Sequence, residues 1–351
     1  MFLRIKQWFM LPLFLSVILS MLFWGEIIGD AVRSALRLCV DTLIPSLFPL
    51  AVLSSWATRS GAAERIFYPW SISLGKLMRT DPKAVPAVFL GILGGYPIGA
   101  LCLQQLREEG SVTRADAERL AACCTNAGPA FLVSVAGRQM LGSMTAGFLL
   151  LLVQTVASLL TMLLLRPNEA YKRTEYTPGK SKQMISSVPV SIAAASASML
   201  NITGFVVISS VICRIVQRFT NNHSAAGILS GIIEVTNGLR AVSALSYTPS
   251  VMFILYSAML GFSGLCVHLQ VASVFLPSSI GLWNYFTGKL FHAGCATLIS
   301  VPISLLLRVP SVAAMAPAAN VIPLSLSIWG ESFLLFSILY TFLWKFRKKA
   351  V

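Results

Sequence analysis

Long apolar stretches, several of about twenty residues, alternate with short basic segments along this chain. A helix of about twenty apolar residues spans the hydrocarbon core of a bilayer. Hydrophobic residues make up 56% of the 351 residues and charged residues only 11%, and the mean hydropathy is +0.76. Soluble domains carry roughly twice this share of charge. The sequence therefore predicts an all-α polytopic membrane protein with a lipid bilayer as its surroundings.

The net charge of +14 indicates either nucleic-acid binding or membrane topology. Lys and Arg lie in short clusters between apolar stretches, which favours topology signals and no nucleic-acid partner. The seven Cys form no C-x-x-C motif and no Cys/His cluster, so we expect neither a disulfide framework nor a metal site. Phosphate-binding and hydrolase motifs are also absent from the sequence, so we expect no enzyme and no cofactor.

Polar segments divide the chain into predicted membrane elements. We expect plain helices over 7–24, 38–57, 143–165, 188–212, 285–307 and 324–344, an interfacial segment over 30–37, and polar loops over 58–83 and 107–119. The predicted parts are N-terminal membrane helices (1–57), a first repeat (58–165), a cytoplasmic linker (166–187), a connecting helix with a second repeat (188–308), and a last helix with a basic tail (309–351).

Two apolar stretches are split in the middle by turn-forming residues. Ala84–Leu106 contains Gly94-Gly-Tyr-Pro-Ile-Gly99, and 225–245 contains Glu234-Val-Thr-Asn-Gly238. Each flank has about ten residues, too few to cross a bilayer. Both stretches therefore favour a re-entrant hairpin over the alternative, one span with a kink.

Two further stretches indicate broken helices, 120–140 at Thr125-Asn-Ala-Gly-Pro129 and 251–275 at Gly261-Phe-Ser-Gly264. Hairpin, broken helix and plain helix thus occur twice in the same order, roughly 140 residues apart. If the hairpins do not cross the membrane, three crossings separate the first hairpin from the second. Because three is an odd number, the two halves would have opposite orientations, which predicts an inverted repeat. A trace from an inside N-terminus leaves most of the 27 Lys and Arg, Lys289 among them, on the inner side. Both termini are then expected to be cytoplasmic.

Unpaired backbone at membrane depth must be buried in protein or line a cavity, so the four breaks predict one solute site. An acid there is costly and usually functional, although Glu234 could instead pair with Arg240. Contact with solute and capping of helix ends stay open for each polar residue. The predicted solute-binding residues are Gly95, Tyr96, Asn126, Glu234, Thr236, Asn237, Ser263 and His268. Residues predicted to set backbone geometry are Gly94, Pro97, Gly128, Pro129 and Gly264.

The segments Gly94–Ala100, Thr125–Pro129, Glu234–Gly238 and Gly261–Gln270 together resemble the nucleoside-recognition (Gate) domain membrane proteins. Within them the chain most resembles the sporulation integral membrane protein YlbJ (SpoVV) type, over about 35–308. The resemblance implies a core similar to that of concentrative nucleoside transporters. It also implies export of dipicolinic acid from the mother cell toward the forespore.

On this resemblance the protein would be a multi-pass protein of a bacterial cell membrane, in particular the outer forespore membrane. Its partner would be a small-molecule substrate, with H⁺ or Na⁺ as a possible coupling ion. A dianionic substrate is unexpected beside Glu234 unless that acid is neutralised or outweighed. Two alternatives remain: a cation-coupled nucleoside or nucleobase transporter, and a membrane scaffold in spore envelope assembly. No feature of the sequence indicates an oligomeric state.

Overall fold

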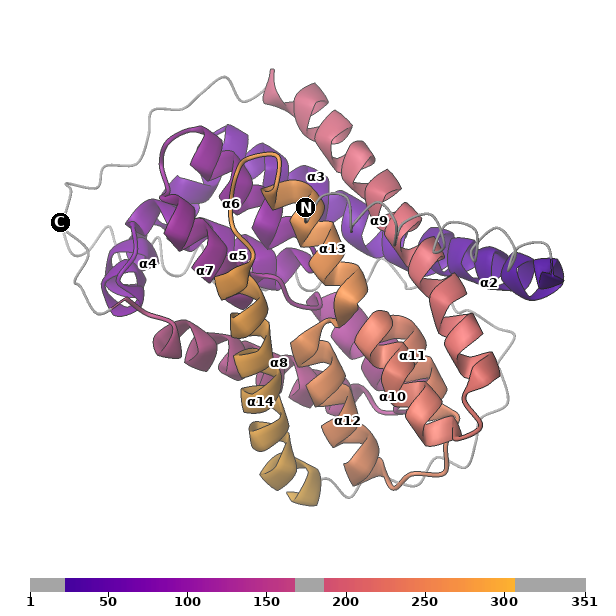
Figure 1. The fold of residues 1–351 in the computed structure, drawn as a ribbon. Coiled ribbons are helices and arrows are strands. Elements are labelled where there is room, and N and C mark those ends of the chain that lie inside the picture. Colours follow the sequence, from indigo (N-terminus) through magenta and orange to yellow (C-terminus); the bar gives the residue numbers. More distant parts are fainter. Residues whose placement is uncertain (1–22, 168–185, 307–351) are drawn as a thin grey trace, which may run out of the picture. The chain divides into compact units, whose positions relative to one another are not determined.

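The computed structural model describes residues 23–167 and 186–306, and every regular element within these ranges is a helix (Figure 1). Large apolar side chains such as Leu200 and Leu305 are 74% and 78% exposed, as expected where lipid covers them. The structure confirms an all-α polytopic membrane protein. The predicted helices 7–24 and 324–344 and most of the linker 166–187 lie outside the described residues. Five described helical segments are long and apolar enough to cross a membrane: Gly25–Arg59, Met144–Leu164, Ser187–Phe219, Pro249–Phe275 and Trp283–Leu305.

The first described helix is continuous, whereas the sequence predicted an interfacial segment followed by a separate span. It comprises α2 (Gly25–Leu38), a π-helical turn η1 (Cys39–Leu43) and α3 (Ile44–Arg59). The π-helical turn lies just before Pro45, whose ring and missing N–H disturb regular α-helical hydrogen bonding. The helix therefore continues through the position at which a boundary was expected.

The predicted polar loop 58–83 is wrong, because most of it forms α4 (Ala62–Met78). Small and apolar residues, among them Ala63, Phe67 and Met78, recur along one buried face of this helix. Its charged residues lie between them and were interpreted as loop residues. A short 3₁₀ turn, η2 (Pro82–Ala84), connects α4 to the next helix.

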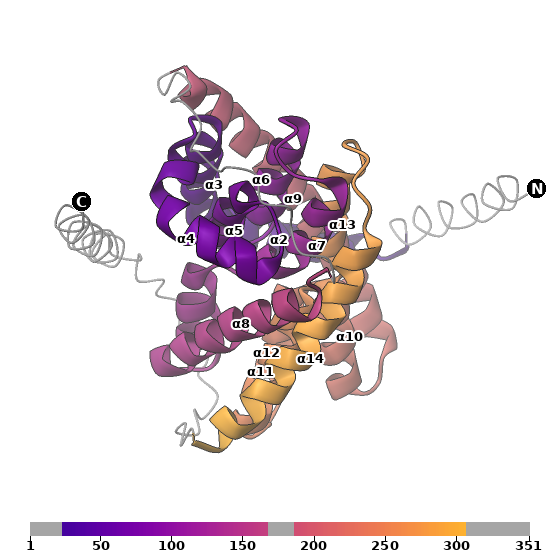
Figure 2. The same ribbon diagram turned by 90° about the vertical axis from the view of Figure 1, so that its left-hand side faces the viewer.

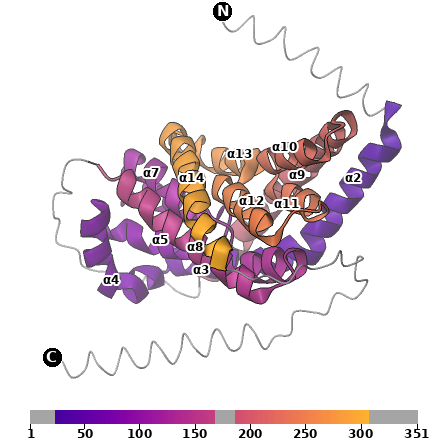
Figure 3. The same cartoon turned by 90° about the horizontal axis from the view of Figure 1, so that it is seen from below.

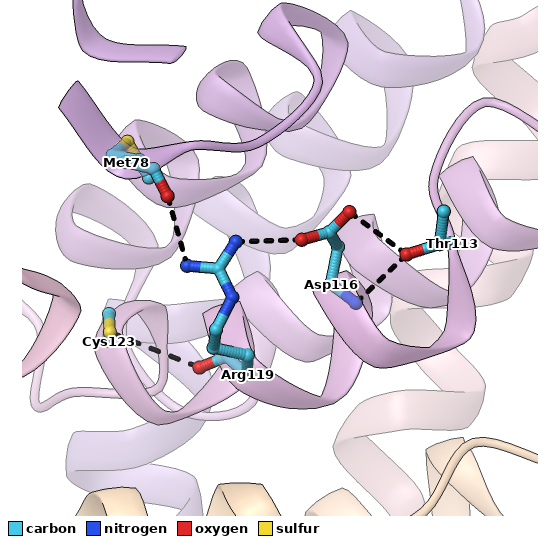
Figure 4. A network of polar contacts seen from close by, with 5 residues as sticks. All are labelled: Met78, Thr113, Asp116, Arg119 and Cys123. Atoms are coloured by element: carbon cyan, nitrogen blue, oxygen red, sulfur yellow. Dashed lines mark hydrogen bonds and ion pairs between the residues drawn. The ribbon is translucent and has the colours of Figure 1, made fainter. Parts of the chain in front are cut away.

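The predicted charged loop 107–119 is also too long, because α7 already begins at Arg114. Thr113 caps its N-terminus by accepting a hydrogen bond from the Asp116 N–H at 3.1 Å (Figure 4). The Arg119 guanidinium donates to Asp116 Oδ1 at 2.7 Å and to the Met78 carbonyl at 3.3 Å. These contacts hold the start of α7 against the end of α4, and they bury an arginine that sequence analysis had placed in a loop.

The two halves carry the same order of elements, as predicted. The first half has a hairpin of α5 and α6, a broken helix of α7 and the π-helix η3, and a plain helix α8. Their bounds are α5 Val85–Gly94, α6 Ile98–Glu108, α7 Arg114–Cys124, η3 Phe131–Met140 and α8 Met144–Leu164. The connecting helix is α9 and the second half runs from α10 to α14. Their bounds are α9 Ser187–Phe219, α10 His223–Ile233, α11 Val235–Ser243, α12 Pro249–Phe262, α13 Gly264–Phe275 and α14 Trp283–Leu306. Opposite orientation of the halves stays a prediction.

Both hairpins close where two glycines face each other. A Cβ atom added to Gly91 would lie 2.9 Å from the Gly99 Cα, and one added to Gly238 would overlap the Gly231 Cα. The short helices of each hairpin can approach this closely only because no side chain separates them. The two glycines Gly91 and Gly231 also correspond in sequence, because Phe89-Leu-Gly-Ile-Leu-Gly94 of the first half resembles Leu229-Ser-Gly-Ile-Ile-Glu234 of the second.

The plain helices of the two halves are packed together. Helix α14 lies beside α8 and α12, and its first turns contact α7 (Figures 1 and 2). Glu118 on α7 accepts a hydrogen bond from the backbone N–H of Asn284 at 2.9 Å, which fixes the start of α14. Helix α9 contacts α2 and α3 as well as α10 and α13 (Figure 3). These contacts bring hairpin tips and helix breaks of both halves toward one region.

Candidate functional site

A cavity lies where the tips of the two hairpins meet. Its volume of about 40 Å³ has room for about three water-sized groups. The first half contributes the tip between α5 and α6 and the break after α7, and the second half contributes the tip between α10 and α11 and part of α13. The wall is completed by the helices α3 and α9. The lining residues are Leu43, Ser46, Leu47, Tyr96, Ala127, Gly128, Phe131, Ile202, Val206, Glu234, Val235, Thr236, Val267 and Gln270.

The tip of the first hairpin packs on the break of its own half. Gly95 has a φ of +81° and approaches Gly128 so closely that a Cβ on Gly95 would lie 2.9 Å from the Gly128 N. The neighbouring Tyr96–Pro97 peptide is cis. Pro129 begins the helical segment that follows the break, the position at which a missing N–H costs least. Gly95, Pro97, Gly128 and Pro129 thus lie where the backbone turns beside the cavity. That they and Gly94 set its geometry stays a prediction.

Tyr96 connects the two halves at the cavity wall. Its hydroxyl donates to the Leu260 carbonyl in the last turn of α12 at 2.9 Å. The Ser263 hydroxyl donates to the same carbonyl at 3.2 Å. Ser263 and Tyr96 therefore converge on one acceptor, although only Tyr96 lines the cavity.

Replacing Tyr96 with phenylalanine should remove the hydrogen bond to the Leu260 carbonyl. We expect a loss of about 1 kcal/mol of stability, seen as a decrease of about 2–4 °C in the Tm of the purified protein. Tyr247→Phe serves as the control, because the Tyr247 hydroxyl has no hydrogen-bond partner among the described residues. Equal Tm values for the two variants would contradict a stabilising role of the Tyr96 hydroxyl.

Glu234 lies at the tip of the second hairpin and is only 3% exposed. Its carboxylate caps α11 by accepting hydrogen bonds from the backbone N–H groups of Thr236 at 3.0 Å and Asn237 at 2.7 Å. The Arg240 side chain is exposed and forms no close ion pair with Glu234 in the described ranges, although its charge still acts on Glu234 over a longer distance. Both interpretations of Glu234, a structural partner of Arg240 and a solute-binding acid, stay predictions. A buried carboxylate held by two N–H groups thus lines the cavity together with Thr236.

The remaining predicted residues of the second half lie around this wall. Asn237 is not among the lining residues, and its amide donates to Ser210 Oγ on α9 at 2.8 Å. Gly264 brings the second break against the second hairpin, with only 3.0 Å between a Cβ placed on it and the Val235 N. His268 is outside the cavity lining, and its ring lies 4.9–5.3 Å from the rings of Phe262, Tyr285 and Phe286.

Asn126 is also not among the residues that line the cavity. Its amide nitrogen donates to the Cys123 carbonyl at 2.7 Å and to Ser158 Oγ on α8 at 3.3 Å. Its amide oxygen accepts from Lys289 Nζ on α14 at 3.1 Å. The structure therefore places Tyr96, Glu234 and Thr236 on the cavity wall. The lining residues do not include the other predicted residues Gly95, Asn126, Asn237, Ser263 and His268. Contact of any of them with a solute stays a prediction.

Sequence analysis missed the polar residues on the plain helices. Lys289 was counted among the cations of the inner surface, but it is 0% exposed and contacts the first break. Gln154 on α8 is buried as well, and it donates to the Ser257 carbonyl on α12 at 3.0 Å. An ionisable residue inside an otherwise apolar run was a signal that could have identified Lys289. The described residues contain no cluster of three or more His, Cys, Asp or Glu suited to a metal ion.

The long apolar helices, the two hairpins and the mostly apolar cavity between them define a multi-pass helical membrane protein. The chain is 23% identical over 305 residues to the sporulation integral membrane protein YlbJ of Bacillus subtilis (strain 168). The similarity covers 75% of this chain and 74% of that relative, and it confirms the predicted resemblance to the YlbJ type. No protein-family model matches the chain, so the Gate domain stays a prediction. No solved structure matches it.

Proposed function

We propose that this protein is a secondary transporter of a small polar or anionic solute. One observation carries the proposal: the tips of both hairpins and the break after α7 contribute to the wall of one cavity. Hairpin tips and broken helices supply backbone groups that bind solutes at membrane depth. A scaffold would have no need for a buried carboxylate in such a wall.

Dipicolinate is the solute that we propose, and export from mother cell toward forespore is the direction. The similarity to a sporulation membrane protein and the motifs that resemble Gate-domain proteins support this choice. The present cavity of about 40 Å³ is smaller than an aromatic dicarboxylate, so its wall has to move during transport. Movement of the hairpins against the rest of the protein would open the cavity to one side at a time.

The geometry of Glu234 suggests how an anion can bind beside an acid. The N–H groups of Thr236 and Asn237 are donors at a helix N-terminus, where negative charge is favoured. In the present state the Glu234 carboxylate accepts from both. We infer that a carboxylate of the solute competes with Glu234 for these two donors. Glu234 would then leave the α11 N-terminus when solute enters and return to it when solute leaves.

The test is uptake of labelled dipicolinate by vesicles that contain the purified protein. We expect uptake above that of protein-free vesicles. A Glu234→Gln variant should lower the rate at least about tenfold, because its amide cannot reproduce the carboxylate's two charge-assisted bonds and therefore displaces bound solute from the two N–H groups more slowly. Glu26→Gln, at an exposed acid, is the matched control and should transport normally. Both variants should reach the wild-type level of folded protein.

Labelled nucleoside in the same vesicles distinguishes the two transport hypotheses. If the vesicles take up nucleoside but not dipicolinate, the solute is a nucleoside and the proposal of dipicolinate is wrong. Absence of flux for both solutes, or an unchanged rate in Glu234→Gln, would contradict the proposed site.

A further inference from the structure

The break between α7 and η3 exposes the C-terminal end of a half-helix inside the protein. Helix α7 ends at Cys124, and the carbonyls of its last turn have no further helical N–H groups to accept from. The C-terminal end of a helix carries a partial negative charge and favours a cation. In transporters with broken helices, such ends and unwound carbonyls coordinate the coupling ion.

A cation is already present at this position, and it belongs to the chain. Lys289 is 0% exposed, and its Nζ lies 2.9 Å from the Thr125 carbonyl, 3.1 Å from Asn126 Oδ1 and 3.3 Å from His292 Nδ1. An ammonium group has three N–H donors. The two oxygens each accept one, and His292 Nδ1 accepts the third in the neutral tautomer that carries its proton on Nε2. The contacts therefore match the needs of a protonated lysine.

No carboxylate forms an ion pair with Lys289 in the parts of the chain that the structure describes. The titratable groups that face it are the thiols of Cys123 and Cys124 on α7, His292 on its own helix, and His268 on α13. Helix α8 contributes the Ser158 hydroxyl, which bonds to the same amide of Asn126. An isolated buried charge is costly, so the helix end and its carbonyls are the groups that compensate it.

We propose that Lys289 takes the place of a coupling cation at the break between α7 and η3, so that the protein works without sodium. Its ammonium group holds the unwound segment together from α14, in the way that a bound ion would. The role of Lys289 as a substitute for a coupling cation rests on the proposed transport function. The cation site itself is tested without any solute, so its test is independent of dipicolinate transport.

The experiment measures the Tm of the purified full-length protein in detergent at constant ionic strength. We expect the wild-type Tm to be the same in sodium chloride and in choline chloride. Lys289→Ala should lower the Tm by about 5–10 °C, because it leaves buried acceptors without a donor. Ethylammonium chloride, a small cation with three N–H donors, should recover at least half of this loss. Tetramethylammonium chloride, which has no N–H donor, should not.

Two further variants complete the design. Lys289→Met keeps roughly the length of the side chain without its charge, so it should lower the Tm. Because the methionine fills the space that ethylammonium needs, ethylammonium chloride should not recover this loss. Lys76→Ala, at an exposed position, should leave the Tm unchanged.

A saturable increase of the wild-type Tm with sodium would overturn the proposal, and this measurement decides the matter even if the Lys289 variants do not fold. A Lys289→Ala variant as stable as the wild type would also overturn it. So would an equal effect of ethylammonium and tetramethylammonium on Lys289→Ala.

Discussion

Replacing Gly91 with alanine is expected to remove most of the folded protein. The added Cβ would overlap the Cys124 carbonyl oxygen and would lie 2.8 Å from the Cys124 Cβ and 2.9 Å from the Gly99 Cα. The obstacles are mostly backbone, so no flexible side chain can move aside. Overpacking of this kind costs about 3 kcal/mol or more. The yield of monodisperse protein and its Tm measure the loss.

Gly238→Ala should behave in the same way, because its Cβ would overlap the backbone of Gly231 in the second hairpin. Gly204→Ala on α9 is the matched control. No atom lies within 4 Å of a Cβ at that position, and alanine is the better helix former. A Gly91→Ala protein that melts within about 2 °C of the wild type would show that the first hairpin is not closed by its two glycines.

Asn126→Ala is also expected to destabilise the protein strongly. It removes two donors and one acceptor at once, and it leaves the buried Lys289 ammonium with one acceptor fewer. Hydrogen bonds to charged groups are worth more than neutral ones, so we expect a loss of about 2–4 kcal/mol. A decrease in Tm of about 5–10 °C would correspond to it.

Asn237→Ala is the natural comparison, because sequence analysis treated the two asparagines as equals. The Asn237 side chain donates to Ser210 alone, so its removal should cost about 1 kcal/mol. Similar losses for the two variants would contradict the contact of Asn126 with Lys289. The comparison requires only purified protein and a Tm measurement.

The membrane elements could be predicted because their signals are local. A run of about twenty apolar residues is sufficient evidence for a span, and Gly94-Gly-Tyr-Pro97 interrupts a run in a way that few structures other than a hairpin allow. Helix α4 was missed because its local sequence signal is misleading. Its charged residues dominate the local pattern, whereas its buried face is defined by distant neighbours such as Phe89.

The site could be predicted only in part because its contacts are long-range. The hairpin tips follow from Gly and Pro, but the direction of each side chain depends on which helix packs behind it. Asn126 faces Lys289, which is 163 residues away, and Tyr96 faces Leu260, which is 164 residues away. The position of Lys289 within an apolar run indicates a buried amine, but nothing near it in sequence shows which groups it contacts. Its contact with Thr125 is visible only once the halves are assembled.

The hydrogen bonds between the two halves determine whether either half can fold alone. The Lys289 ammonium in the second half finds two of its acceptors, the Thr125 carbonyl and Asn126 Oδ1, in the first, and Tyr96 in the first half finds its acceptor, Leu260, in the second. Either half expressed alone would therefore keep buried polar groups that it cannot satisfy. We expect separately produced fragments to be recovered only when both are present in one cell. Each half would then repeat the same order of helices but would not fold without the other half.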